Sequence, residues 1–95
     1  MPIYAVELTF DQDEEFRLSV RPAHRAYLTE QTALGTLVMA GPYTDDTGAL
    51  QVYDVPDRAA LDAVVAADPY FAGDRAACTV SSVREWTVLD FSGSA

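Results

Sequence analysis

Residues 36–55 read TLVMAGPYTDDTGALQVYDV, a stretch that predicts a β-hairpin. Its first five residues are almost entirely apolar, which is typical of a central strand. Gly41-Pro42 is expected to end this strand, because proline cannot donate to a sheet ladder. The sequence DDTG at residues 45–48 has the composition of a turn. Residues 49–55 are therefore predicted to return as the second strand of the hairpin.

A strand and a helix are predicted before this hairpin. Apolar side chains alternate along residues 3–10, as in a strand whose second face is also partly apolar. The acidic residues 11–15 are predicted to form a loop. A helix is then expected to start near Pro22, which suits a first turn, and to run to about Leu34, where Gly35 provides a left-handed cap.

A second helix and a last strand are predicted after the hairpin. Asp57 is the expected N-cap of this helix, Pro69 breaks it, and residues 78–91 form a long strand. The order strand, helix, strand, strand, helix, strand predicts an α+β, ferredoxin-like βαββαβ fold, with a four-stranded antiparallel sheet and two helices on one face. Residues 1–95 are expected to form one domain, because a chain of this length supports a single core.

The second face of the predicted sheet is partly apolar and is not covered by the predicted helices. Two helices cover one face only, yet residues 3–10 and 36–40 carry apolar side chains on both faces. We therefore expect an identical subunit to bury the second face across a two-fold axis, which makes the protein a homodimer. Trp86 is assigned either to the core or to this dimer contact.

The charge of the chain argues against several classes of function. Its 6 Lys+Arg and 15 Asp+Glu residues give a formal net charge of −9, so neither nucleic-acid binding nor membrane-surface binding is expected. The sequence contains no lysine, which excludes Schiff-base chemistry, pyridoxal phosphate attachment and a P-loop. The first ten residues lack the basic start of a signal peptide and no apolar run reaches membrane-spanning length, so a cytoplasmic location is expected.

Neither a metal nor a cofactor is expected. His24 and Cys78 are the only histidine and the only cysteine, so a zinc ligand set of the usual spacing cannot be assembled. The acidic runs at residues 11–15 and 45–48 do not continue into a calcium-loop pattern. Cys78 lacks electropositive surroundings in the sequence and is interpreted as a structural residue.

Two polar residues fall where apolar side chains are expected. At 100° per residue, His24 and Asp68 each lie on the apolar face of a predicted helix. If the two helices lie side by side on one sheet, imidazole and carboxylate can meet as an acid/base pair. Asp68 would then orient the imidazole, and His24 would act as the general base or acid. No serine has a recognisable nucleophile context, so proton abstraction beside a carbonyl or enol, with elimination or isomerisation following, is favoured over hydrolysis.

The motifs resemble those of the YCII-related proteins. The residues that carry the resemblance are RLSVRPAH at 17–24, GTLVMAGP at 35–42, and DPY at 68–70 with Gly73 shortly after. The resemblance implies a ferredoxin-like fold, dimers of the α/β-barrel type, and an active site whose histidine and aspartate map onto His24 and Asp68. One similar group removes chloride from chlorinated hydroxyhydroquinones. The short connection at residues 45–48 departs from some relatives and leaves the pocket size open.

The expected function is therefore that of a small YCII-like enzyme with a His–Asp dyad. Its substrate would be a small enolisable or hydroxylated aromatic molecule, and its reaction would be of the lyase, dehydrochlorinase or isomerase type. The pair also has a structural interpretation, in which His24 and Asp68 only bind each other and tie the helices together. The alternative function is that of a non-catalytic dimer that binds a small molecule or assists another protein.

Five further residues are candidates for substrate binding. Arg21 and Arg17 either hold an anionic or phenolate substrate or neutralise the acidic loop. Gly41 and Pro42 either shape the floor of a pocket or only end a strand. Tyr70 either lines an apolar pocket or packs in the core.

Overall fold

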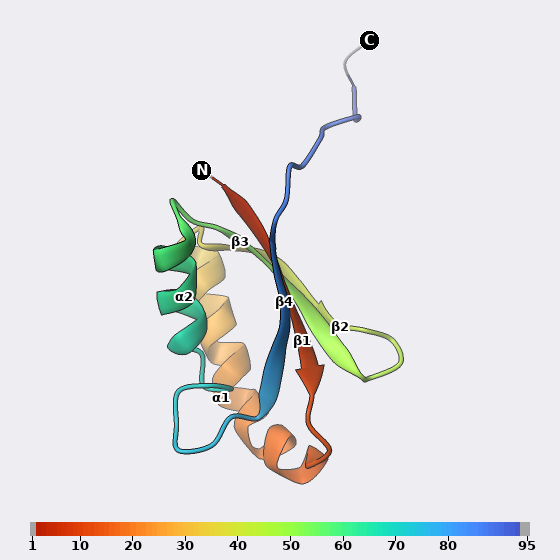
Figure 1. The fold of residues 1–95 in the computed structure, drawn as a ribbon, viewed down its shortest axis with the longest axis vertical. Coiled ribbons are helices and arrows are strands. Elements are labelled where there is room, and N and C mark those ends of the chain that lie inside the picture. The colour runs from red at the N-terminus through yellow and green to blue at the C-terminus, as the bar shows by residue number, and fades with distance from the viewer. Residues whose placement is uncertain (1, 94–95) are drawn as a thin grey trace.

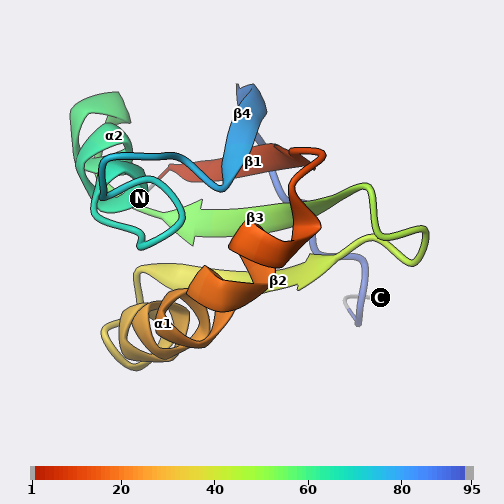
Figure 2. The same ribbon diagram turned by 90° about the horizontal axis from the view of Figure 1, so that it is seen from below.

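The computed structural model describes residues 2–93, which form four strands and two helices (Figure 1). The strands pair antiparallel throughout, in the order β2-β3-β1-β4, which Figure 2 shows from below. This is the α+β, ferredoxin-like βαββαβ fold that the sequence predicts. The elements are β1 (Ile3–Phe10), α1 (Glu14–Ala33), β2 (Leu37–Pro42), β3 (Gly48–Asp54), α2 (Arg58–Ala66) and β4 (Cys78–Glu85).

Both helices lie on one face of the sheet, to the left of the strands in Figure 1. The alternating side chains of β1 that are buried on this face are Tyr4, Val6 and Leu8. Tyr53 of β3 and Leu61 of α2 belong to the same buried cluster. Burying a large apolar side chain contributes about 1.5–3 kcal/mol, so this layer fixes both helices on the sheet.

Helix α1 begins at Glu14, well before its predicted start near Pro22. Part of the acidic stretch predicted as a loop is therefore helical, because Asp13 caps the helix and accepts the backbone N–H of Phe16 at 3.0 Å. Pro22 lies inside the helix on an exposed position, where water can bind the carbonyl that loses its N–H partner. Gly35, with φ at 80°, is the predicted left-handed cap. Neither helix of the described chain is long and apolar enough to cross a membrane.

Two predictions about the strands are wrong. β2 is an edge strand that pairs only with β3, whereas its apolar composition predicts a central strand. β4 ends at Glu85 rather than at Phe91, because its partner β1 starts at Ile3, whose carbonyl accepts the Trp86 N–H at 2.8 Å. The described chain then leaves the sheet (Figure 1), and Trp86 is 45% exposed, so it is not a core residue.

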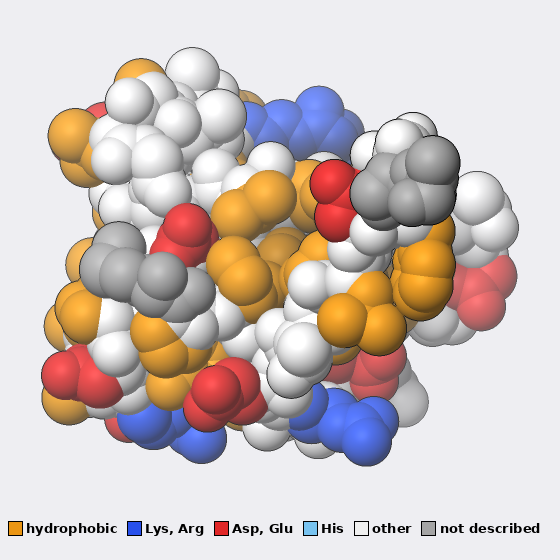
Figure 3. All heavy atoms as spheres, turned by 90° about the horizontal axis from the view of Figure 1, so that it is seen from above, with side chains coloured by type: hydrophobic (Ala, Val, Ile, Leu, Met, Phe, Trp, Pro, Cys, Tyr) orange, Lys and Arg blue, Asp and Glu red, His pale blue; other side chains and the backbone are white. Residues whose placement is uncertain are grey.

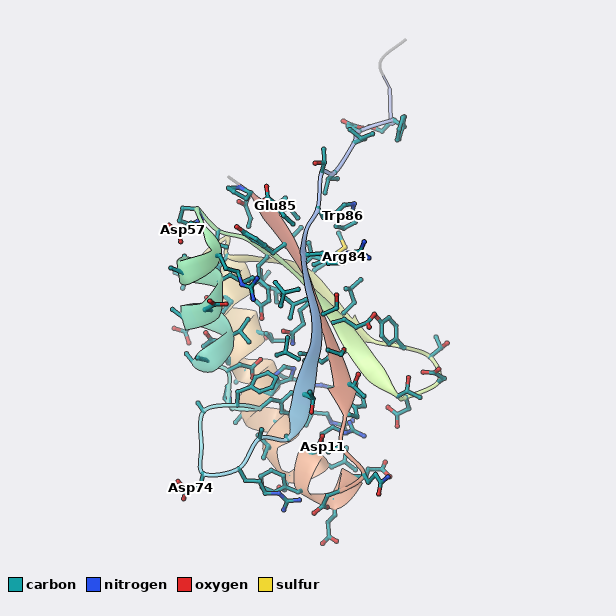
Figure 4. All side chains as sticks on the ribbon, in the orientation of Figure 1. Asp11, Asp57, Asp74, Arg84, Glu85 and Trp86 are labelled. Atoms are coloured by element: carbon teal, nitrogen blue, oxygen red, sulfur yellow. The ribbon has the colours of Figure 1, made fainter. Side chains whose placement is uncertain are left out.

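The face of the sheet away from the helices is uncovered in the single chain. Met39 of β2 is paired with β3 on this face and is 59% exposed. A groove of about 410 Å³ on the same face is lined by Ala5, Leu50, Arg84, Glu85 and Trp86. Figure 4 shows Arg84 and Trp86 projecting on the side of the sheet opposite the helices. Viewed from above, hydrophobic side chains gather around a hollow that charged side chains border (Figure 3).

Candidate active site

Helix α1 turns three polar side chains toward the protein interior. Its buried residues are Arg17, His24 and Gln31, which are seven residues apart. Seven residues bring an α-helix back to nearly the same face. His24, in the middle of this row, is only 7% exposed. The inward orientation predicted from helix periodicity is therefore confirmed for His24.

Asp68 lies just after the end of α2, and its side chain is fully buried. Its backbone carbonyl accepts the N–H groups of Phe71 and Ala72, so the chain turns sharply at this point. Its Oδ1 accepts the backbone N–H of Tyr70 at 2.9 Å and lies 2.7 Å from Nδ1 of His24. Among residues 2–93, its buried Oδ2 has no hydrogen-bond partner. The structure thus brings the imidazole and the carboxylate together.

The contact with Asp68 defines the roles of the two imidazole nitrogens. A carboxylate can only accept hydrogen bonds, so the short contact places a proton on Nδ1 of His24. In a neutral imidazole, Nε2 is then unprotonated and can accept a proton. The ring of Tyr70 stacks on the imidazole with centroids 3.7 Å apart and planes 8° apart, which fixes its orientation. An imidazole held in this way can accept a proton at Nε2, and the Asp68 carboxylate would stabilise the charged form.

His24 lines a cleft of about 260 Å³ between α1 and the β2–β3 hairpin. Four of the five candidate substrate-binding residues line the same cleft: Arg21, Gly41, Pro42 and Tyr70. Arg17 lines it as well, so Arg17 and Arg21 both flank the site. Sequence reasoning did not single out the remaining lining residues, which are Phe10, Arg25, Leu28, Ala40, Asp46, Ala49 and Gln51.

Two of these remaining residues could have been recognised from the sequence, Arg25 by its spacing and Gln51 by its polarity. Arg25 follows the candidates Arg17 and Arg21 at intervals of four residues, and this spacing places all three along one face of a helix. Gln51 lies in the middle of an otherwise apolar strand, where a polar side chain needs a partner. In the structure its Oε1 accepts the hydroxyl of Tyr53 at 2.8 Å.

The cleft is more positive than the chain as a whole. Arg17, Arg21 and Arg25 line it, whereas the full chain has a formal net charge of −9. Burial raises the pKa of the Tyr70 hydroxyl, and the guanidinium groups of Arg17 and Arg21 oppose this rise. Such a site suits a small molecule that carries an anionic or phenolic oxygen.

Cys78 is a poor nucleophile in this structure. Its burial, with the negative charge of Asp68, raises the pKa of the thiol to about 12. The thiol therefore stays protonated at neutral pH, and only the thiolate is reactive. Within residues 2–93, no group of three or more His, Cys, Asp or Glu side chains is placed to hold a metal ion.

A family model for the YCII-related domain matches residues 3–87, which include all six elements of the fold. The chain belongs to the YCII-related family. Among solved structures, this YCII-related protein is similar to the 5-chloro-2-hydroxyhydroquinone dehydrochlorinase of Burkholderia phenoliruptrix in complex with 2,5-dihydroxybenzoquinone. The two sequences are 20% identical, the match covers 90% of this chain and 93% of that chain, and the TM-score is 0.74. This similarity shows a shared fold. No curated protein sequence matches the chain.

Proposed function

We propose that this YCII-related protein is an acid/base enzyme acting on a small enolisable or hydroxylated aromatic substrate. The observation that carries the proposal is the 2.7 Å contact between His24 Nδ1 and Asp68 Oδ1 beside an open cleft. This contact leaves Nε2 as the proton acceptor, and histidine exchanges protons near neutral pH. A base without an adjacent nucleophile suits a lyase of the dehydrochlorinase type, or an isomerase.

One base is sufficient for dehydrochlorination of a substrate such as 5-chloro-2-hydroxyhydroquinone, the molecule named for the similar enzyme. His24 takes the proton of the hydroxyl next to the chlorine-bearing carbon and returns a proton to that carbon, which gives the keto tautomer. A second hydroxyl then loses its proton to His24, its electrons move into the ring, and chloride leaves. The net change is loss of HCl and formation of a hydroxybenzoquinone, so the reaction needs no external oxidant.

The substrate is proposed to lie between α1 and the β2–β3 hairpin. Arg21 binds an anionic or phenolate oxygen, because it lines the cleft one helical turn from His24. Gly41 and Pro42 form the wall opposite the helix. Tyr70 packs on the imidazole and presents its ring to the cleft.

A non-catalytic dimer that binds a small molecule, or assists another protein, is the second candidate. One observation favours it: Asp68 Oδ1 also accepts the Tyr70 backbone N–H, so the carboxylate has a structural role in the turn after α2. In this case the dyad ties the two helices together, and the cleft holds a ligand without turnover. The two candidates differ in what a change at His24 does to the ligand.

Chloride release from 5-chloro-2-hydroxyhydroquinone tests the proposal. The proteins compared are wild type, His24→Gln, Asp68→Asn and the control Arg58→Gln, since Arg58 pairs with Asp62 on exposed α2. We expect release by wild type and control, and a loss of about 10²–10⁴-fold in both dyad variants. Deuterium exchange into small ketones, measured in the same four proteins, covers the isomerase reaction. Neither reaction above background in wild type, or equal rates in all four proteins, contradicts the proposal and favours the binding dimer.

We also propose that the uncovered face of the sheet forms a homodimer. This face carries the groove beside Trp86 and exposes Met39 at 59%, although solvated sheet faces usually carry polar side chains. A two-fold contact would bury the same apolar patch on both copies at once.

A further inference from the structure

Arg17 is a buried cation on the wall of the cleft. Its side chain is only 5% exposed, although arginine is almost never fully buried unless it is paired. Helix α1 places it seven residues before His24, which is about 10 Å along the helix axis and on the same face. Arg17 and His24 both line the cleft, so one ligand can reach both.

The protein gives Arg17 no close anionic partner. The Tyr70 hydroxyl lies near its guanidinium group, whose interaction opposes the rise in the Tyr70 pKa. The guanidinium carbon of Arg17 lies 3.9 Å from the centroid of the Phe10 ring, which fixes the group in place. The nearest carboxylate oxygens belong to Glu14 at 4.0 Å and Asp46 at 3.8 Å, both beyond hydrogen-bonding distance. Nε of Arg17 is buried and has no hydrogen-bond partner within residues 2–93. A buried cation in this state is costly unless an anion binds it closely.

Asp46 reaches Arg17 from the turn between β2 and β3. It has a left-handed backbone, with φ at 62°, a conformation that aspartate and asparagine tolerate better than most residues. Its side chain is 64% exposed, so it can leave Arg17 for water at little cost. Asp46 is thus a loosely held internal anion at a position where a ligand oxygen would form closer hydrogen bonds.

We propose that the buried Arg17 is the main anion-binding residue of the cleft, with the half-buried Arg21 assisting it. Arg17 takes a planar carboxylate or phenolate group, and this group displaces Asp46. The inference rests on the proposed function only in that both place a small molecule in this cleft. Bidentate recognition of a planar anion by arginine is a strong and specific interaction. The anion held at Arg17 would extend a ring of benzene size toward Nε2 of His24, which selects aromatic acids and phenolates over neutral analogues.

Benzoate and benzamide, which match in shape and differ in charge, are the probes that test this inference. Binding is followed by NMR shifts of the Tyr70 amide at constant ionic strength. We expect benzoate to bind wild type about tenfold or more tightly than benzamide. Arg17→Gln should abolish this preference. Asp46→Asn should increase the affinity for benzoate several-fold, because it removes the competing negative charge. The control Arg58→Gln should change the affinity for neither probe. Equal binding of the two probes by wild type, or benzoate binding that Arg17→Gln leaves intact, overturns the inference.

Two further comparisons test the role of Arg17 if Arg17→Gln does not fold or if the proposed reaction is not observed. If Arg17→Gln does not fold, the preference of wild type for benzoate and the effect of Asp46→Asn decide, because Asn keeps the left-handed backbone. His24→Gln should bind benzoate like wild type, since the anion is held at the other end of the cleft. Charge preference that persists in His24→Gln while chloride release is absent in every protein supports Arg17 and rejects the proposed reaction. Chloride release by a wild-type protein that binds both probes equally supports the proposed reaction and rejects the role of Arg17.

Discussion

The ring of Tyr70 lies flat on the imidazole of His24, with centroids 3.7 Å apart and planes 8° apart. The backbone N–H of Tyr70 also binds Oδ1 of Asp68, the same oxygen that faces the imidazole. Tyr70 therefore fixes both members of the dyad, the imidazole by stacking and the carboxylate by a hydrogen bond. This arrangement explains how side chains from two separate segments keep a short contact.

Two replacements of Tyr70 should show the effect of its stacked ring, because both keep the backbone N–H that binds Asp68. Tyr70→Phe keeps the ring on His24, so we expect turnover close to that of wild type. Tyr70→Leu removes the stacked ring and should lower the free energy of unfolding by about 1–3 kcal/mol, as a buried aromatic side chain is lost. It should also lower turnover by about tenfold, because the imidazole is no longer held in one orientation. Urea denaturation and initial rates measure both effects, and equal rates for the two variants would argue against an orienting role for Tyr70.

Two glycines should respond in opposite ways to alanine. A Cβ at Gly48 would clash with the carbonyl oxygen of Leu8 on the neighbouring strand, so Gly48→Ala must push β1 and β3 apart. We expect a loss of about 1–3 kcal/mol in the free energy of unfolding. A Cβ at Gly41 meets nothing within 4 Å, so Gly41→Ala should fold with nearly unchanged stability. Similar melting temperatures for the two variants would contradict this packing.

The stability of the fold should decrease in alkaline solution. The thiol of Cys78 has an ordinary pKa of 9.0, and burial raises its pKa to about 12 in the folded protein. Between these values the unfolded chain loses the proton and the folded chain keeps it, so the free energy of unfolding falls as pH rises. Cys78→Ala removes this proton, and its stability should fall less steeply between pH 8 and pH 10. Burial also raises the pKa of Tyr53, which adds to the fall above pH 10 in both proteins. Urea unfolding at several pH values measures the slopes, and identical slopes would refute the assignment.

The homodimer is testable on the uncovered face of the sheet. Met39→Asp places a charge on a side chain that is 59% exposed in the single chain, so the subunit itself should fold normally. In a dimer the same change buries an unpaired carboxylate, which should weaken association by at least about tenfold. Sedimentation at micromolar concentration should give the mass of two chains for wild type and a lower mass for Met39→Asp. A mass of one chain for wild type would contradict the proposed homodimer.

The order of elements and the inward orientation of His24 and Asp68 were predictable from the sequence. Alternation along β1 and the apolar stripe of α1 follow directly from the periods of strands and helices. His24 and Asp68 were visible because each is a polar residue on an apolar face, and a buried polar group needs a partner. The 2.7 Å contact between them depends on how α1 and α2 pack, which a single sequence does not specify.

Other features were missed because an interaction that the sequence pattern does not reveal decides them. The start of α1 is set by the cap at Asp13, which outweighs the preference of Pro22 for a first turn. The edge position of β2 depends on which strands pair with β3, and apolar composition does not distinguish a central strand from an edge that a partner could cover. Asp46 lies 3.8 Å from Arg17 across the fold and has a left-handed backbone, neither of which the sequence pattern indicates.

The most direct test of the dyad is the protonation of the His24 ring, measured by two-bond ¹H–¹⁵N NMR correlation in wild type and in Asp68→Asn. We expect the neutral form of the wild-type ring to carry its proton on Nδ1 and to leave Nε2 free, because the Asp68 carboxylate accepts that proton at 2.7 Å. In Asp68→Asn, whose amide can donate to Nδ1, the proton should move toward Nε2. A neutral wild-type ring with its proton on Nε2, or a tautomer that Asp68→Asn leaves unchanged, would contradict the proposed dyad.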